Sequence, residues 1–321
     1  MTPETIALIV ILAIALVLLI GAYICYSITF KRKKEGPDDP FNGLDMPGFG
    51  PFVSGIHAMI RKLQPIPYED VYIKSHDGLK LHARYYHKVD GAPIIIKVHG
   101  YNGCPTRDFC GGGVEALDKV YNVLLLDQRA HEYSEGKTTC FGIKEKYDVR
   151  DWAKYLVKRF GKKTKIVIYG ISMGAATVLM VSGMKRLPKN IVGVMADCSY
   201  TSPKDIIIKV ATKDMHIPGK LCFPLIWLGA RIFGRFNLTS DSPVKAVRRN
   251  KLPLLIVHGL ADTFVPPYMS KKIYEEATTE DKKLLLFKGA GHGISYMNNR
   301  DVYIAEMEAF LSKTTGYKPN I

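Results

Sequence analysis

Residues 164–185 read Thr-Lys-Ile-Val-Ile-Tyr-Gly170-Ile-Ser172-Met-Gly174-Ala-Ala-Thr-Val-Leu-Met-Val-Ser-Gly-Met-Lys. The apolar, β-branched segment before Gly170 predicts a buried strand, and the segment from Ala175 to about Lys185 predicts a helix. The pentapeptide between them fits G-x-S-x-G, in which a serine on a sharp turn exposes its hydroxyl beside the first helical amides. The letters alone are a weak pattern, because ordinary turns also contain Gly and Ser. With the strand before it and the helix after it, Ser172 is a candidate nucleophile.

A reactive serine needs a base, and the base needs an orienting acid. Downstream, residues 252–258 predict a strand that is followed by a loop with Asp262, and residues 283–287 predict a strand that is followed by a loop with His292. Ser172, Asp262 and His292 therefore follow the carboxyl ends of three predicted strands, in the order nucleophile, acid, base. The gaps of 90 and 30 residues leave room for intervening strands and helices.

These segments resemble the α/β-hydrolase superfamily, over about residues 66–315. The resemblance also includes Val98-His-Gly-Tyr101, after the apolar stretch 93–98, and the loop 126–136. It implies a mostly parallel central sheet with helices on both faces, an acyl-transfer reaction, and an oxyanion hole made by the backbone N–H groups of Tyr101 and Met173. Relatives usually have Gly where Glu132 stands, a difference that touches no catalytic role.

Each candidate has an alternative interpretation. Asp262 could be a helix cap, and Asp197, at the end of the predicted strand 191–196, could be the acid, because some similar enzymes place it one strand earlier. The loop around Asp262 is the closer match to the family. Among the nine histidines, His99 and His258 stand beside strand ends and are expected to brace loops, which leaves His292, between two glycines, as the base.

The composition limits the other classes of site. The six cysteines form no C-x-x-C pair and no zinc-ligand spacing, so no metal is expected, and the acyl chemistry requires no cofactor. Cys104, Cys110 and Cys140 all fall in loops near the candidate site, where free thiols or a disulfide are both compatible with the sequence. The net charge of +15 has no accompanying nucleic-acid motif. A membrane partner explains this charge better, since anionic lipid attracts Lys and Arg.

The N-terminus contains a candidate membrane span. Residues 6–30 form an uncharged run rich in Ile, Leu, Val and Ala, long enough to cross a bilayer with some tilt. A signal peptide fits less well, because the run is too long and lacks a basic leader. The basic cluster 31–34 follows directly and predicts that the catalytic domain lies in the cytoplasm. We therefore expect a single-pass anchor with a basic stop over residues 1–34.

The rest of the chain divides into three parts. Residues 35–65 predict a Gly/Pro/Asp-rich linker and a short amphipathic helix, residues 66–200 and 251–321 the α/β core, and residues 201–250 an inserted helical lid. The lid segment carries nine Lys or Arg against three Asp, a net +6, around an apolar middle that includes Trp227. It either packs on the sheet or opens toward lipid to admit an acyl chain.

The sequence therefore predicts a membrane-anchored serine hydrolase that acts on a small-molecule or lipid acyl ester. Two alternatives remain. A serine peptidase or aminopeptidase shares this fold, but it needs a carboxylate to hold the peptide amine, and no acidic cluster indicates one. A catalytically silent, membrane-tethered binding protein is the other, and three matched catalytic groups argue against it. The acyl-chain length, the head group and the oligomeric state cannot be read from the sequence.

Overall fold

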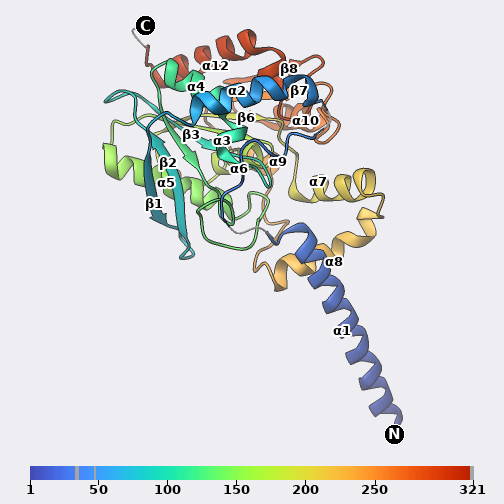
Figure 1. The fold of residues 1–321 in the computed structure, drawn as a ribbon. Helices are drawn as coiled ribbons and strands as arrows, with labels where there is room; N and C mark the ends of the chain where they lie inside the picture. Colours follow the sequence, from blue (N-terminus) through green and yellow to red (C-terminus); the bar gives the residue numbers. More distant parts are fainter. Residues whose placement is uncertain (33–35, 47, 319–321) are drawn as a thin grey trace.

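A computed structural model describes residues 1–32, 36–46 and 48–318. Figure 1 shows a rounded α/β body from which one long helix projects, with the N-terminus at its far end. This helix, α1 (Pro3–Thr29), matches the predicted span and begins three residues earlier. Thr2 caps it, because its side-chain oxygen accepts a hydrogen bond from the amide of Thr5. It is the one helix among the described residues that is long and apolar enough to cross a membrane.

The body is built on one eight-stranded sheet in the order β1-β2-β4-β3-β5-β6-β7-β8. Its strands are β1 (Glu69–Lys74), β2 (Lys80–Tyr86), β3 (Ile94–Val98), β4 (Asn122–Leu126), β5 (Ile166–Ile171), β6 (Ile191–Asp197), β7 (Leu254–Gly259) and β8 (Lys282–Phe287). β1 and β2 form an antiparallel hairpin, β2 pairs antiparallel with β4, and the other pairs are parallel. Because consecutive parallel strands require crossover connections, the carboxyl ends of β3 to β8 lie at one edge, where candidate residues gather.

Helices cover both faces of the sheet, as predicted. Side chains alternate along each strand, so that Ile94, Ile96 and Val98 of β3 point to one face while Ile95 points to the other. The first face is covered by α5 (Glu145–Phe160), α6 (Met173–Ser182), α9 (Pro243–Val247) and α10 (Tyr268–Glu276). The second is covered by α2 (Val53–Leu63), α4 (Cys110–Asp118) and α12 (Arg300–Thr315), seen together in Figure 1.

The segment between β6 and β7 forms a separate helical layer next to α1. We call it the α7–α9 segment; it contains α7 (Pro203–Lys209), the π-helical turn Val210–Asp214, α8 (Gly219–Ile232) and α9. α8 crosses α1 closely, since a Cβ on Gly229 would lie 2.4 Å from the carbonyl oxygen of Ala22. Aromatic contacts extend the junction, with the rings of Tyr23 and Phe233 5.1 Å apart. The carboxyl-terminal part of α1 is thus packed against the body (Figure 1).

The chain after α1 is also integrated into the body. The side chains of Tyr26 and Phe30 are buried, and Lys31 pairs with Thr138 in an isolated bridge. In the predicted basic cluster, the side chain of Arg32 is only 6% exposed and forms an ion pair with Asp38 instead of facing outward. Lys33 and Lys34, the rest of that cluster, lie outside the described residues.

The predicted linker is packed on the body where the structure describes it. Apolar side chains between its Gly, Pro and Asp residues join a small core with α2, in which Leu44, Ile56 and Ile60 are buried. The short amphipathic helix predicted within residues 35–65 is α2, and its apolar side packs on the body. All six cysteines lie in the described part of the chain and are present as thiols.

Candidate active site

Ser172 lies on a sharp turn between β5 and α6. Its backbone has φ 55° and ψ −115°, a conformation that non-glycine residues rarely adopt and that is associated with functional sites. The two glycines of the pentapeptide are required for steric reasons. A Cβ on Gly170 would lie 2.2 Å from the backbone of Gly174, and a Cβ on Gly174 would lie 1.8 Å from the carbonyl oxygen of Val98. The turn is therefore pressed against β3. The helix after it, α6, begins at Met173, two residues earlier than predicted, and ends at Ser182.

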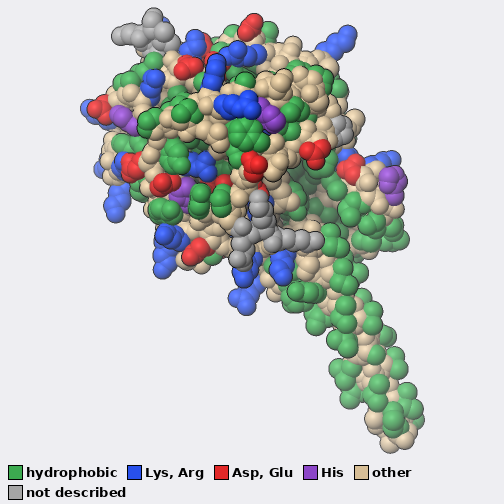
Figure 2. All heavy atoms as spheres, viewed as in Figure 1, with side chains coloured by type: hydrophobic (Ala, Val, Ile, Leu, Met, Phe, Trp, Pro, Cys, Tyr) green, Lys and Arg blue, Asp and Glu red, His purple; other side chains and the backbone are tan. Residues whose placement is uncertain are grey.

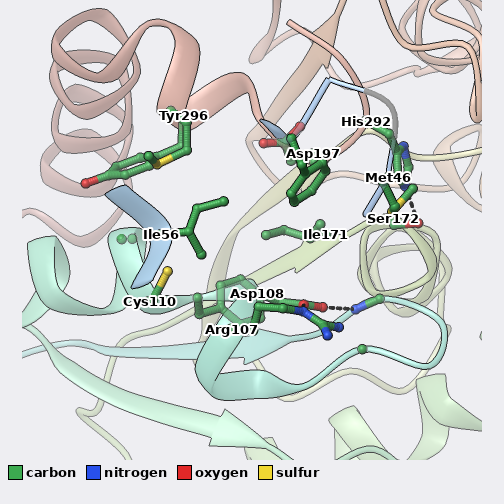
Figure 3. A pocket seen from close by; sticks show the side chains of 18 of the residues that line it. Met46, Ile56, Arg107, Asp108, Cys110, Ile171, Ser172, Asp197, His292 and Tyr296 are labelled. Atoms are coloured by element: carbon green, nitrogen blue, oxygen red, sulfur yellow. Dashed lines mark hydrogen bonds and ion pairs between the residues drawn. The ribbon is translucent and has the colours of Figure 1, made fainter. Parts of the chain in front are cut away.

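The structure brings Ser172, His292 and Asp262 together at the carboxyl edge of the sheet. His292 Nε2 lies 2.9 Å from Ser172 Oγ, and His292 Nδ1 lies 2.7 Å from Asp262 Oδ2. Figure 3 shows the side chains of Ser172 and His292 next to each other at one end of a cavity. Because Asp262 accepts from Nδ1–H, Nε2 is left as a lone-pair acceptor that points at the hydroxyl.

Asp262 is held in place from both of its oxygens. Oδ1 accepts the backbone N–H groups of Phe264 and Val265, at 3.0 and 2.8 Å. Oδ2 faces His292 and also lies 3.2 Å from Nε2 of His258. Burial raises the pKa of Asp262, but the hydrogen bonds from the two histidines outweigh it and lower this pKa to about 2. Asp262 is therefore a carboxylate at neutral pH.

His99 and His258 brace loops, as expected from their positions beside strand ends. His258 Nε2 donates to the carbonyl oxygen of Val265, at 2.7 Å, which fixes the loop that carries Asp262. His99 Nε2 accepts the backbone N–H of Gln128, at 3.1 Å. Both side chains are fully buried, and among the described residues neither is hydrogen-bonded to Ser172.

The backbone amides of Tyr101 and Met173 flank the serine. Met173 is the first residue of α6, so its N–H has no partner within the helix. Tyr101 follows Gly100, at which a Cβ would lie 3.5 Å from Cβ of Ser172. Within the described part of the chain, neither amide donates a hydrogen bond to another residue. Asp108 holds this loop, because its Oδ2 accepts the N–H of Gly100 at 2.9 Å.

Asp197, the alternative acid, has a different set of partners. Its Oδ2 accepts the hydroxyl of Tyr303 at 2.9 Å, and its backbone carbonyl accepts the N–H of Ser172 at 2.8 Å. Burial raises the pKa of Asp197 to about 6. Oδ1 is buried and has no hydrogen-bond partner among the described residues. Asp262, not Asp197, is therefore the carboxylate bonded to His292.

Two cavities meet at Ser172 and Tyr101. The first cavity, of about 200 Å³, has a mainly apolar lining, but it also contains four charged or titratable side chains beside the serine: Arg107, Asp108, Asp197 and His292 (Figure 3). We call it the polar cavity because of these four side chains. The apolar cavity, of about 320 Å³, lies on the other side of Tyr101 and is lined mainly by aliphatic side chains from α1 and the α7–α9 segment. An ester has two substituents, and each of the two cavities that meet at Ser172 offers space for one of them.

Sequence reasoning missed the residues that line these cavities. Arg107 and Asp108 belong to no sequence motif, and their place depends on the packing of α3 (Pro105–Asp108) against the loop that carries Gly100 and Tyr101. The contribution of α1 residues Cys25, Ile28 and Thr29 to the apolar cavity was equally unexpected. A membrane span is recognised by its uniform hydrophobicity, which gives no information about which side chains face the body.

Two clusters of potential metal ligands occur among the described residues, Cys198 with Asp262 and His292, and His76 with Asp77 and Asp148. In the first, Asp262 and His292 are bonded to each other. In the second, Arg129 binds both carboxylates, at 2.9 Å from Asp77 and 2.6 Å from Asp148. These hydrogen bonds account for the clustering, so we propose no metal at either place.

Two family models match the chain. Residues 93–218 match the model described as alpha/beta hydrolase fold, and residues 228–299 match the one described as serine aminopeptidase, S33. The uncharacterized protein YqkD of Bacillus subtilis is 27% identical over 61% of this chain and 63% of its own length, just under two thirds. The uncharacterized membrane protein YNL320W of Saccharomyces cerevisiae is 24% identical, over 71% of this chain and 74% of the relative.

Solved structures share the fold. The Pyrococcus furiosus esterase Pf2001 superposes with a TM-score of 0.66, at 23% identity, over 79% of this chain and 94% of the esterase. A puromycin-hydrolyzing peptidase of Mycobacterium tuberculosis superposes with a TM-score of 0.60, at 19% identity, over 79% of this chain and 40% of the peptidase. At these sequence identities, the superpositions show that the fold is shared and nothing further.

Proposed function

Since this chain belongs to the α/β-hydrolase superfamily, we propose that it is a serine hydrolase that cleaves carboxylic esters through an acyl-enzyme on Ser172. The observation that carries this proposal is the continuous hydrogen-bonded chain from Ser172 Oγ through His292 to Asp262, with distances of 2.9 and 2.7 Å. These are the contacts that serine activation requires.

The proposed reaction follows from this arrangement. His292 Nε2 takes the hydroxyl proton as Ser172 Oγ attacks the ester carbonyl carbon, and the carboxylate of Asp262 stabilises the imidazolium. The amides of Tyr101 and Met173 would bind the oxyanion; losing one such donor typically costs about 3–4 kcal/mol in kcat. His292 then returns the proton to the leaving alcohol. Water, activated by the same imidazole, releases the acid.

An ester with an apolar acyl group fits the two cavities best. The apolar cavity is lined almost entirely by aliphatic and aromatic side chains and suits a hydrocarbon chain. The polar cavity, with Arg107 and two carboxyl groups, suits an alcohol that bears hydroxyl or charged substituents. We propose that the α7–α9 segment acts as the lid over the acyl side, with residues 201–250 as its bounds.

A peptidase is the second candidate, and one specific observation favours it. Asp197 lines the polar cavity, and its buried Oδ1 has no hydrogen-bond partner among the described residues, so this carboxyl group is a candidate for holding a substrate amine. The match to the serine aminopeptidase model points the same way. In the ester hypothesis the same oxygen accepts a hydroxyl of the leaving alcohol.

We further propose that α1 anchors the protein in a membrane as a single-pass span, with the catalytic domain in the cytoplasm. A cleaved signal sequence would not have Tyr26 and Phe30 buried in the body of the mature protein. Protease treatment of intact cells tests the orientation, because external cleavage beyond Lys34 would place the domain outside.

Active-site labelling tests the proposed function. A fluorophosphonate should label Ser172 in the full-length protein and should fail to label Ser172→Ala. If folded wild-type protein is not labelled, the membrane-tethered binding protein becomes the better hypothesis. The ratio of kcat/KM for p-nitrophenyl esters to that for aminoacyl p-nitroanilides then separates the two enzymes: a preference for the anilides would establish the peptidase.

A further inference from the structure

The membrane-spanning helix contributes directly to the site. Cys25, Ile28 and Thr29, in the last two turns of α1, line the same apolar cavity as Ser172 and Met173. The hydroxyl of Tyr101 donates to the carbonyl oxygen of Thr29 at 3.0 Å. The residue whose amide flanks the serine is therefore bonded to the end of the helix. A tether that only held the domain at a membrane would need none of these contacts.

The mouth of the apolar cavity has an exposed apolar rim. Ile28 is 58% exposed, and Met215 and Ile217, which follow the π-helical turn of the α7–α9 segment, are 48% and 38% exposed. Large apolar side chains that are exposed to water are energetically unfavourable, and a patch of them marks a surface that contacts lipid or a protein partner.

This rim continues along α1. Val17, Ile20, Ile24 and Ile28 recur at three- and four-residue spacing, so they lie on one face of the helix. Each is more than half exposed. Figure 2 shows the apolar surface of α1 running up to the body, where Lys and Arg side chains lie on the adjacent lower surface. Basic side chains at that level suit the lipid head groups.

From these contacts we propose that α1 forms a wall of the acyl-binding cavity, and that the substrate is an ester of a long-chain fatty acid that enters directly from the bilayer. The acyl chain slides along the stripe 17–28, passes the rim at Ile28 and reaches Ser172 without crossing water. The polar head group stays on the side of the polar cavity. This inference rests on the proposed function, and it adds the substrate class and the route.

Chain-length selectivity in the full-length protein tests the proposal. Cys25 lines the cavity and is partly buried, so Cys25→Phe places a ring in the path of a long chain. We expect kcat/KM for p-nitrophenyl palmitate in detergent micelles to fall at least tenfold, a loss in the range of one or two displaced methylene contacts. The value for p-nitrophenyl acetate should change less than about twofold, because the acetyl group stays beside Ser172.

Two further variants serve as checks. Ile28→Trp, at the rim, should lower palmitate hydrolysis in the same selective way. Leu12→Trp, which is 59% exposed on α1 but lies N-terminal to the stripe 17–28 and outside the cavity lining, should leave the palmitate-to-acetate ratio unchanged. Fluorophosphonate labelling at the wild-type rate shows that each variant is folded around an intact Ser172.

The outcomes separate the two proposals. If Cys25→Phe and Ile28→Trp lower both esters equally, or neither, then α1 is not part of the acyl site, while the hydrolase proposal stands. If they act as expected but the wild-type protein cleaves palmitate in micelles and not in phospholipid vesicles, entry from the bilayer is refuted. If wild-type Ser172 is not labelled at all, the proposed function fails and this inference fails with it.

Discussion

Replacing Asp262 by Asn exchanges one oxygen for an NH₂ group and should reverse the hydrogen bonding of His292. The N–H groups of Phe264 and Val265 both point at Oδ1, so the amide oxygen of the new side chain would occupy that position. Its NH₂ group would then stand 2.7 Å from His292 Nδ1, where the carboxylate oxygen was. An NH₂ donor forces Nδ1 to be the acceptor and puts the proton on Nε2. In that tautomer the imidazole cannot take the proton of Ser172.

The expected loss is large. The wrong tautomer lowers kcat about 10⁴-fold in other serine hydrolases, or about 5 kcal/mol of transition-state stabilisation. Initial rates with a p-nitrophenyl ester at about pH 7–8 measure it. Asp197→Asn is the matched control, because Asp197 is bonded to Tyr303 rather than to His292, and it should stay within about tenfold of wild type. A loss of about a thousandfold in Asp197→Asn, with Asp262→Asn nearly active, would refute the assignment.

The same substitution predicts a change in acid stability. The folded pKa of Asp262, about 2, lies below its ordinary value of 3.8. The carboxylate therefore contributes stability that is fully present above about pH 4 and is lost as the pH falls through about 2. Wild type should lose on the order of 2 kcal/mol of unfolding free energy across this window, and Asp262→Asn should not show that loss. Urea unfolding at a series of pH values from about 5 down to about 2, followed by circular dichroism, provides the measurement.

Three other predictions concern stability. Gly174→Ala should lower the unfolding free energy, measured by urea unfolding, by about 3 kcal/mol or more, because the new Cβ would lie 1.8 Å from a backbone oxygen of β3. Gly50→Ala is the control: a Cβ at Gly50 would have no atom within 4 Å, so this substitution should cause no measurable loss. Burial lowers the pKa of Lys97 to about 7, so the unfolded chain binds this proton between about pH 7 and 10 while the folded protein does not. Over that range the unfolding free energy of wild type, measured relative to that of Lys97→Met, should therefore rise with pH. Gly229→Leu should separate α8 from α1, because even a Cβ at this position would lie 2.4 Å from the carbonyl oxygen of Ala22. The substitution should therefore lower the thermal unfolding temperature, and an unchanged temperature would mean that the two helices do not pack in solution.

Much of the fold could be predicted because its signals are local. The strands predicted after β4 are short apolar runs that end at turns, and the structure places them within one or two residues of the predicted bounds, as for β7 at Leu254–Gly259. The place of Ser172 follows from two glycines that only one kind of turn requires. The meeting of His292 with Ser172 could be expected from strand order, since parallel strands end at a common edge.

What could not be predicted depends on packing between distant segments. The linker has no periodic hydrophobic pattern, yet its residues Leu44 and Phe49 lie beside the site because they pack against apolar side chains of α2 and α4. Likewise, a uniformly apolar helix gives no indication that Cys25 faces a cavity and Ile24 does not. Lys97, a charged residue in the middle of β3, is accommodated over the rings of Phe109 and Tyr169, at 5.1 and 4.4 Å. Only the folded arrangement reveals these partners.

The way α1 enters the body has a mechanical consequence. Tyr26 is hydrogen-bonded to Thr138 at 2.7 Å, and Phe30 and Arg32 exchange backbone hydrogen bonds with residues 137–139. If α1 spans a bilayer, these hydrogen bonds join it rigidly to the body, so the body is held at a fixed height and orientation relative to the membrane. Its reach is then limited to molecules that diffuse laterally past it, and changes in bilayer thickness would be transmitted through the helix to the loop at Tyr101.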